Sequence, residues 1–307
     1  MFLELENITI GYQSPLIKNA DAALSLGEVC LIIGNNGVGK TTLFRTVLHQ
    51  IPALSGNIRI DKKDIKTFST KEIAKYIAMV FSKPQVPAHY TTEDLISLGK
   101  YVHYPYYFEL EKKDKEEVQH IIQNLNLGPY KDWNLQKLSD GNLQKAFIGR
   151  AFAQNAPVMI LDEPTTHLDE ENKIIILKLL RDFAEKYNKL VLFSSHDWRL
   201  AKEFADKIWF IKDQTLHAGV AEDILISHQD LAAPFLFNMD QYFIPPVISA
   251  PLLEKEFLYS ALQKNFKKDL SSFQFSYKNP FWEISTSEFV HQCRSFEEII
   301  HFLRKRS

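Results

Sequence analysis

The residues of this chain best suited to bind a phosphate group lie between Gly34 and Thr42. They follow the spacing G-x-x-x-x-G-K-[ST], in which glycines let the backbone turn tightly. An apolar run at 29–33 precedes them, and an amphipathic stretch over 40–50 follows. A buried strand, a turn and the N-terminus of a helix are the order that an anion-binding loop requires. We therefore expect phosphate contacts from Gly34, Asn35, Asn36, Gly37, Val38, Gly39, Lys40, Thr41 and Thr42.

Two side chains of this loop supply groups that backbone amides lack, namely a positive charge and a hydroxyl. Lys40 is expected to bridge the β- and γ-phosphates of a nucleoside triphosphate as a point charge. The Thr41 hydroxyl is expected to ligate the Mg²⁺ ion that accompanies such a nucleotide. A chance glycine-rich turn is a poor alternative, because the strand, the helix and the Lys-Thr pair all stand in register.

A pair of acids follows a second apolar run. Residues 158–161 are expected to form a buried strand that delivers Asp162 and Glu163 to the edge of the sheet where the loop lies. Asp162 is placed to act at the Mg²⁺ ion, and Glu163 is placed to polarise the water that attacks the γ-phosphate. An apolar run ending in two acids is common by itself. Its combination with a phosphate loop is what favours nucleotide hydrolysis.

Strand-like and helix-like segments alternate along most of the chain, which predicts an α/β fold with a mostly parallel sheet flanked by helices. The expected strands span residues 2–6, 8–12, 29–33, 56–61, 78–81, 158–161 and 190–194, with a hairpin at 208–211 and 215–218. The expected helices span residues 40–50, 69–77, 94–98 (closed by Gly99), 112–124, 141–154, 172–187 and 198–205.

The character of the chain changes after about residue 241, where aromatic residues and lysine become frequent. Prolines mark a linker at 245–251, and the expected elements beyond it are strands at 273–277 and 281–284 and a capped helix at 295–304. We expect this tail to be a small α+β extension. A regulatory or dimer-forming role is the alternative to simple packing on the core.

Composition limits the function classes that need consideration. The chain has 307 residues and a formal net charge of −2, so it has no whole-chain attraction to DNA or to a membrane surface. Cys30 and Cys293 are too far apart in sequence for a zinc or redox motif, and Cys30 is expected to be a small core residue. No segment approaches the roughly 18 apolar residues of a membrane span, and the N-terminus does not resemble a signal peptide. We expect a cytosolic protein whose membrane role, if it has one, depends on a partner.

The loop and the acid pair stand in order with five further motifs, and together they resemble the ATP-binding subunits of ABC transporters. Residues 138–142 resemble the signature motif, and residues 165–169 resemble the D-loop. Gln85 is similar to the Q-loop glutamine, Tyr12 to the aromatic residue that stacks on adenine, and His196 to the switch histidine.

The resemblance implies a homodimer of ATPase subunits with ATP and Mg²⁺ as cofactors. Each ATP would lie between the phosphate loop of one copy and Ser139 with the Gly141 amide of the other, so that binding closes the dimer. The same resemblance implies that Asp169 crosses the interface and that His196 contacts the γ-phosphate. It makes Gln85 both a residue of the catalytic site and a Mg²⁺ ligand.

The fold implied by the resemblance is a P-loop NTPase core of the ABC ATPase type. It adds an antiparallel N-terminal β subdomain and an α-helical subdomain at about 86–155 that contains the signature motif. The ATP-binding domain would span residues 1–240, and residues 241–307 would be the C-terminal extension.

Two residues depart from the signature pattern. Asp140 and Asn142 stand where the family usually has Gly and Gln. The charge of Asp140 would repel a phosphate group unless its side chain points away or caps the helix. We still expect ATPase activity, because Glu163 and His196 are both present.

Residues 91–103 are similar to the stretch that precedes the helical subdomain in importers of iron-siderophore complexes, haem and cobalamin. This resemblance implies integral membrane permease subunits as partners, docked on residues 86–108, and indirectly an extracytoplasmic substrate-binding protein. It places the chain at the cytoplasmic face of the inner membrane, held there through the permease.

Two alternatives belong to other function classes. A soluble ABC ATPase of nucleic-acid repair or translation usually has a long coiled-coil insertion or a second ATPase copy, and this chain shows neither, so we expect no nucleic-acid partner. A non-hydrolysing ATP-binding regulator would be compatible with Asp140 and Asn142.

Overall fold

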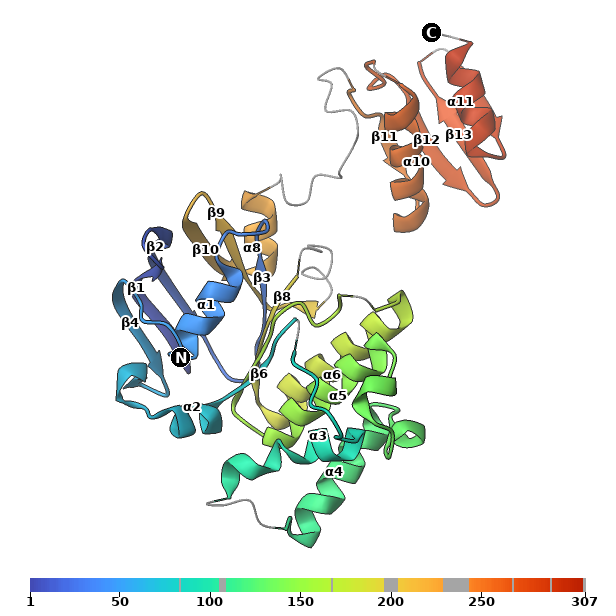
Figure 1. The fold of residues 1–307 in the computed structure, drawn as a ribbon. Helices are drawn as coiled ribbons and strands as arrows, with labels where there is room; N and C mark the ends of the chain where they lie inside the picture. The colour runs from blue at the N-terminus through green and yellow to red at the C-terminus, as the bar shows by residue number, and fades with distance from the viewer. Residues whose placement is uncertain are drawn as a thin grey trace. The chain divides into compact units, whose positions relative to one another are not determined.

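The computed structural model of the chain describes residues 1–82, 84–104, 109–166, 168–195, 204–228, 243–266, 268–287 and 289–305. The chain divides into two compact units, residues 1–232 and 233–307. The first unit contains a four-stranded sheet and a six-stranded sheet, and the second contains another four-stranded sheet with helices beside it (Figure 1).

The small sheet of the first unit is antiparallel and has the strand order β2-β1-β4-β5. Its strands are β1 (Leu3–Gly11), β2 (Pro15–Leu24), β4 (Ser55–Ile60) and β5 (Lys63–Asp64). The two strands predicted at 2–6 and 8–12 are one strand. Asn7 has a φ of 45°, and the pairing register shifts around it, which is why the sequence pattern is interrupted there. β2 was not predicted.

The six-stranded sheet has the order β10-β9-β3-β8-β7-β6 and is parallel except for β10, so the prediction of a mostly parallel sheet is confirmed. Its strands are β3 (Val29–Ile33), β6 (Ile77–Val80), β7 (Val158–Leu161), β8 (Leu190–Ser194), β9 (Lys207–Lys212) and β10 (Thr215–Val220). The predicted hairpin is present. Asp213 and Gln214 form its turn with φ values of 48° and 64°, the left-handed conformation that such tight turns use.

Alternate residues of the central strands face two separate cores. In β3, Leu31 belongs to the core shared with the helices that follow β6, and Cys30 and Ile32 belong to the core beneath the small sheet. Both faces of the central sheet are therefore covered, which explains why its strands read as continuous apolar runs.

Except at residues 221–227, where no helix was predicted, the helices of the first unit match the predicted positions within a few residues. They are α1 (Lys40–Val47), α2 (Thr70–Tyr76), α3 (Thr92–Ser97), α4 (Lys112–Asn124), α5 (Asp140–Gln154), α6 (Glu170–Tyr187) and α8 (Ala221–Ser227), with short 3₁₀ turns η1 (Ile65–Thr67), η2 (Lys100–His103), η3 (Gly128–Tyr130) and η4 (Leu135–Lys137). α1 ends before Gln50 because His49 has a φ of 54°. Most of the helix predicted at 198–205 lies outside the described residues.

Gly99 does not end α3 in the way predicted. Its φ is −58°, and the chain continues into η2 instead of stopping at a left-handed cap. The glycine is required by close packing, since a Cβ atom at this position would lie 2.2 Å from the Arg150 carbonyl oxygen of α5. α3 and α5 can therefore approach each other only because residue 99 has no side chain.

The second unit has a sheet of order β11-β12-β13-β14. Its elements are β11 (Val247–Ser249), α10 (Leu252–Asn265), β12 (Gln274–Lys278), β13 (Phe281–Ser285), β14 (Val290–Cys293) and α11 (Phe296–Arg304). The predicted strands and the predicted helix near the C-terminus are present. The proline-marked linker at 245–251 is wrong, because this stretch contains β11 and the N-cap of α10.

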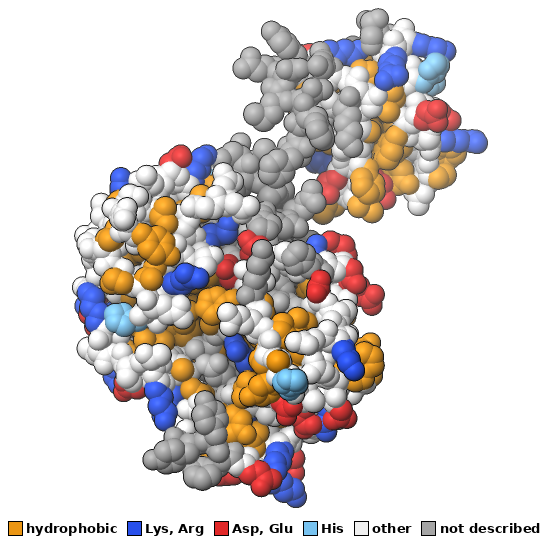
Figure 2. Space-filling view, viewed as in Figure 1, with side chains coloured by type: hydrophobic (Ala, Val, Ile, Leu, Met, Phe, Trp, Pro, Cys, Tyr) orange, Lys and Arg blue, Asp and Glu red, His pale blue; other side chains and the backbone are white. Residues whose placement is uncertain are grey.

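The second unit has its own apolar core, in which Leu258, Phe275 and Trp282 are buried. Part of α10 is exposed instead: Leu253 is 58% exposed and Phe257 is 54% exposed. Figure 2 shows hydrophobic side chains gathered on one side of this unit. In the described part of the chain, no helix is long and apolar enough to cross a membrane.

Both cysteines are buried and unpaired, as expected for Cys30. Burial raises the pKa of the Cys30 thiol well above its ordinary value, and burial also raises the pKa of the Cys293 thiol. Each therefore acts as a small apolar group in the core of its own unit.

We predict that Gly99→Ala destabilises the first unit by about 1–3 kcal/mol or more, because the added methyl group meets backbone atoms of α5 that cannot move aside. The measurement is urea unfolding followed by circular dichroism. Gly128→Ala is the matched control, since nothing lies within 4 Å of a Cβ atom there. Equal stability of the two variants would contradict the close packing of α3 on α5.

Candidate nucleotide site

The loop that joins β3 to α1 has the backbone that its glycines allow. Gly37 and Gly39 have φ values of 83° and 111°, which L side chains rarely adopt. A Cβ atom on Gly34 would lie 2.7 Å from Val38 Cγ2 and 2.9 Å from the Ile211 carbonyl oxygen. The glycine spacing read from the sequence therefore reflects a tight loop whose amides lead into the first turn of α1.

Lys40 lies inside this loop and is 6% exposed. Its ammonium group donates to the carbonyl oxygens of Gly34 at 2.6 Å and of Asn35 at 3.2 Å. Burial lowers the pKa of Lys40, while the charges of Glu163 and Asp162 act in the opposite direction. A desolvated cation next to exposed loop amides is suited to receive an anion.

Asp162 is the first residue after β7 and is 4% exposed. Its Oδ2 accepts a hydrogen bond from the Thr41 hydroxyl at 2.9 Å, and its Oδ1 accepts one from the Ser194 hydroxyl at 2.7 Å. The structure thus brings together two of the three residues predicted to ligate Mg²⁺, Thr41 and Asp162. A carboxylate and a hydroxyl are hard oxygen donors, which fit that ion.

Glu163 has a φ of 53°, the left-handed conformation that is uncommon for a residue with a side chain. Its backbone N–H donates to the Ser194 hydroxyl at 2.9 Å, and its Oε2 accepts from the Thr166 hydroxyl at 3.3 Å. The charge of the Glu163 carboxylate acts to raise the pKa of Lys40, so this carboxylate lies near the Lys40 ammonium group. It can serve there as a base toward water.

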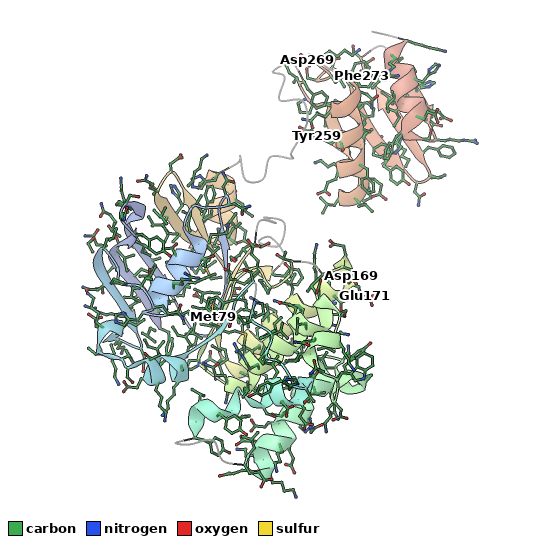
Figure 3. The ribbon with its side chains drawn as sticks, viewed as in Figure 1. Met79, Asp169, Glu171, Tyr259, Asp269 and Phe273 are labelled. Atoms are coloured by element: carbon green, nitrogen blue, oxygen red, sulfur yellow. The ribbon has the colours of Figure 1, made fainter. Side chains whose placement is uncertain are left out.

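The signature and D-loop residues form a second group. Ser139 is the N-cap of α5 and accepts from the Asn142 N–H at 3.4 Å, and Asp140 is the first residue of the helix. Asp169 is the N-cap of α6 and accepts from the Asn172 N–H at 2.8 Å. Figure 3 shows Asp169 and Glu171 together at this end of α6.

These two helix ends lie side by side, since a Cβ atom on Gly141 would be 3.3 Å from Leu168 Cδ2. Hydrogen bonds from Asn172 lower the pKa of Asp169, so its exposed carboxylate stays ionised. Among the described residues, no hydrogen bond or ion pair joins Ser139, Gly141 or Asp169 to the phosphate loop. The predicted site residues therefore form two groups within one chain.

Two further predicted residues, Tyr12 and Gln85, make no side-chain hydrogen bond to the loop in the part of the chain that the structure describes. Tyr12 follows β1 and is 57% exposed. The same hairpin carries Leu16, whose Cβ is 3.1 Å from a Cβ atom built on Gly39, so Tyr12 is close to the loop in sequence and fold. Gln85 is exposed in the segment after β6. His196 lies outside the described residues and stands two positions after the last residue of β8 in the sequence.

Ser194 and Thr166 were not singled out from the sequence, although both hydroxyls bond to the acid pair. The signal for Ser194 is a polar residue at the end of an apolar strand, in the same position along β8 that Asp162 has after β7. Thr166 lies in the D-loop motif, and its distance of three residues from Glu163 could have suggested the contact.

Known proteins are similar to this chain over most of its length. Residues 17–166 match the family model described as ABC transporter. The petrobactin import ATP-binding protein FpuD of Bacillus anthracis is 30% identical over 253 residues, which cover 81% of this chain and 92% of that protein. The achromobactin transport ATP-binding protein CbrD of Dickeya dadantii is 31% identical, over 80% of this chain and 91% of that protein.

Solved structures of ABC transporter components are also similar to this chain. An inward-facing metal-chelate type ABC transporter is similar with a TM-score of 0.65 and 26% identity, covering 73% of this chain and 85% of that chain. The cbiO1 protein of Clostridium perfringens, part of the ABC transporter complex cbiONQ, is similar with a TM-score of 0.65 and 25% identity, covering 75% of this chain and 92% of that chain.

We predict that Lys40→Met weakens ATP binding by about ten- to a hundredfold, since the charged hydrogen bonds to phosphate are lost. The variant should unfold at the same temperature as the parent or higher. The lowered pKa means that the buried charge costs stability at neutral pH, and this cost disappears only as the pH rises toward the ordinary value of 10.5. Fluorescent-ATP titration and thermal unfolding measure the two effects.

The control for this experiment is Lys189→Met. Lys189 also donates to a backbone carbonyl oxygen, that of Asn155 at 3.0 Å, and burial also lowers its pKa. It has no role in the loop, so ATP affinity should be that of the parent. Parent-like ATP affinity in Lys40→Met would contradict the phosphate-binding role.

Proposed function

The chain belongs to the ABC transporter family, and on this premise we propose that it is the ATP-hydrolysing subunit of an importer for iron-siderophore complexes, haem or cobalamin. The observation that supports this proposal most directly is the meeting of Lys40, Thr41 and Asp162 beside the loop. Its relatives FpuD and CbrD are named for petrobactin import and achromobactin transport, which supports an iron chelate as cargo.

ATP is the nucleotide that this family binds, and we propose how the chain holds it. The loop amides from Gly34 to Thr42 and the Lys40 ammonium would bind the phosphates, and Tyr12 would stack on adenine. Thr41, Asp162 and Gln85 would hold a Mg²⁺ ion, which when bound would neutralise charge on the β- and γ-phosphates.

Hydrolysis needs a base and a polarising group beside the γ-phosphate. Glu163 would accept the proton of the attacking water, because its carboxylate lies toward Lys40 and is oriented by the Thr166 hydroxyl. His196 would contact the γ-phosphate from the segment after β8. The acids lie in a largely buried setting, where their charges act more strongly than in water.

The two separate groups of site residues support a homodimer. Ser139, the Gly141 amide and Asp169 would complete the nucleotide site of a second copy, since among the described residues they make no hydrogen bond or ion pair with the loop of their own chain. Asp140 is the first residue of α5, where an acid interacts favourably with the helix dipole, so its charge is compatible with a working signature motif.

The partners follow from the proposed role. Integral membrane permease subunits would dock on residues 86–108 and hold the chain at the cytoplasmic face of the inner membrane, and an extracytoplasmic substrate-binding protein would deliver the cargo. We assign residues 1–240 to the ATP-binding domain, with its helical subdomain at about 86–155, and leave 241–307 as an extension. The relatives' names favour this role over nucleic-acid repair, translation or non-hydrolysing regulation.

We predict that Glu163→Gln lowers the turnover number for ATP about a hundredfold or more, because the amide cannot accept the proton of the attacking water. ATP binding should persist, so the variant should accumulate as an ATP-bound dimer. Phosphate release and size-exclusion chromatography with MgATP measure these results. Glu222→Gln, an exposed acid on α8, is the control and should hydrolyse ATP at the parent rate.

The cargo class needs a separate readout. In vesicles that contain the permease, a ferric siderophore, haem and cobalamin can each be supplied with the substrate-binding protein while phosphate release is followed. Stimulation by one of the three identifies the cargo. Stimulation by none of them, with basal hydrolysis intact, would contradict the importer assignment but not the ATPase.

A further inference from the structure

We propose that Ser194 is a positioning residue of the ATPase site, whose single hydroxyl holds the carboxylate of Asp162 and the backbone of Glu163 in a fixed relation to each other. This inference rests on the proposed function, since it is through these two acids that Ser194 would act. It adds a residue that neither the motifs nor the family's signature residues include.

The first support is the pair of hydrogen bonds at one oxygen atom. The hydroxyl has one proton, which it donates to Asp162 Oδ1 at 2.7 Å. The same oxygen accepts the Glu163 N–H at 2.9 Å. Rotation of the Ser194 side chain would therefore break both bonds together, so the two acids are held through one atom.

The second support is the state of the Asp162 carboxylate. Its other oxygen, Oδ2, accepts from Thr41 at the start of α1. Hydroxyl groups from two different elements therefore each donate a hydrogen bond to one oxygen of the Asp162 carboxylate. Together these bonds fix the plane of the carboxylate. Without Ser194 the carboxylate would keep one side-chain hydrogen bond among the described residues, that from Thr41, and could rotate about its bond to Cβ.

The third support is complete burial. Ser194 is 0% exposed, so water does not reach the hydroxyl from the surface. Replacement by alanine would leave Asp162 Oδ1 without this donor and the Glu163 N–H without its acceptor. The space left by one oxygen atom is too small for a water molecule to take over both bonds.

The fourth support is the conformation of Glu163. A φ of 53° is strained for a residue with a Cβ atom and persists only where its surroundings fix it. The bond to Ser194 fixes the N–H of this residue and so fixes the direction in which its side chain leaves the backbone. An aligned base is worth more to catalysis than a mobile one.

The position of Ser194 in the sheet explains how its hydroxyl can bond to both Asp162 and Glu163. β8 lies between β3 and β7, and Ser194 is paired with Ile32 near the end of β3. Its neighbour Phe193 is paired with Leu161, the last residue of β7. The hydroxyl therefore stands at the edge where the strand before the phosphate loop and the strand before the acids both end.

The test compares Ser194→Ala with Ser194→Thr, which keeps the hydroxyl, and Ser194→Cys, which keeps the size. Steady-state hydrolysis gives the turnover number and the KM for ATP. Fluorescent-ATP titration over a series of Mg²⁺ concentrations gives the Mg²⁺ concentration for half-maximal binding, independently of turnover. Thr46→Val is the matched control, because the Thr46 hydroxyl is also buried and donates to the Thr42 carbonyl oxygen at 2.9 Å.

For Ser194→Ala we expect a turnover number lower by about ten- to a hundredfold and a half-saturating Mg²⁺ concentration higher by about tenfold, the range seen when partners of ligating residues are removed. The KM for ATP should be that of the parent, since the loop is intact. Ser194→Thr should restore the turnover number, or Ser194→Cys should restore it in part if the extra methyl group is not accommodated. Thr46→Val should lose stability without losing turnover.

A parent-like turnover number in Ser194→Ala would overturn the inference, and so would an equal loss of turnover in Thr46→Val, which would indicate a merely structural effect. Glu163→Gln, measured alongside, distinguishes a failure of the proposed ATPase function from a failure of the positioning role of Ser194. If it hydrolyses ATP at the parent rate, the proposed base is wrong and the failure belongs to the proposed function. If it does not, a parent-like Ser194→Ala contradicts the positioning role alone.

Discussion

The burial of the Asp162 carboxylate is the constraint on which the rest of the nucleotide site depends. A carboxyl group that is 4% exposed is tolerated only where hydrogen bonds from the protein replace those from water. Those bonds come from Thr41 and Ser194, on α1 and β8, and Lys40 adds a positive charge nearby. The loop, α1, β7 and β8 must therefore keep their positions relative to one another. Otherwise the Asp162 carboxylate would be buried without hydrogen-bond partners.

The same requirement explains why the central sheet is so uniformly apolar. β3, β7 and β8 are covered on both faces, so the polar residues that serve the site can stand only where the strands end. The loop leaves β3 there, Asp162 leaves β7 there, and Ser194 closes β8. The ends of parallel strands bring together residues that are far apart in the sequence.

Most of the first unit could be predicted because local and tertiary signals agree. The apolar strands, the glycine loop and the capped helices each follow from their own residues. β2 was missed because polar residues such as Lys18 and Asn19 interrupt its apolar positions, and pairing with β1 decides its structure. The interpretation of Gly99 as a cap was wrong, because only the fold shows that α5 passes within 2.2 Å of its missing side chain.

The site residues that belong to a sequence motif could be predicted. Those that act only through a contact made in the folded chain could not. Thr41 and Asp162 were expected to act on one ion, and the structure joins them by a hydrogen bond. Ser194 is one serine after four apolar residues, and no spacing rule distinguishes it from a chance polar end. In the second unit, α10 has apolar residues on its exposed side as well as its buried side, so it has no amphipathic period to read.

The two buried thiols leave the surface of the described chain without a reactive sulfur. Alkylating reagents attack the thiolate, and both Cys30 and Cys293 are shielded and hold their protons more firmly than an exposed cysteine does. A cysteine introduced at an exposed position would therefore take up a maleimide dye or spin label selectively in the native protein. Distances between such labels could then be followed through a turnover cycle without first replacing the native cysteines.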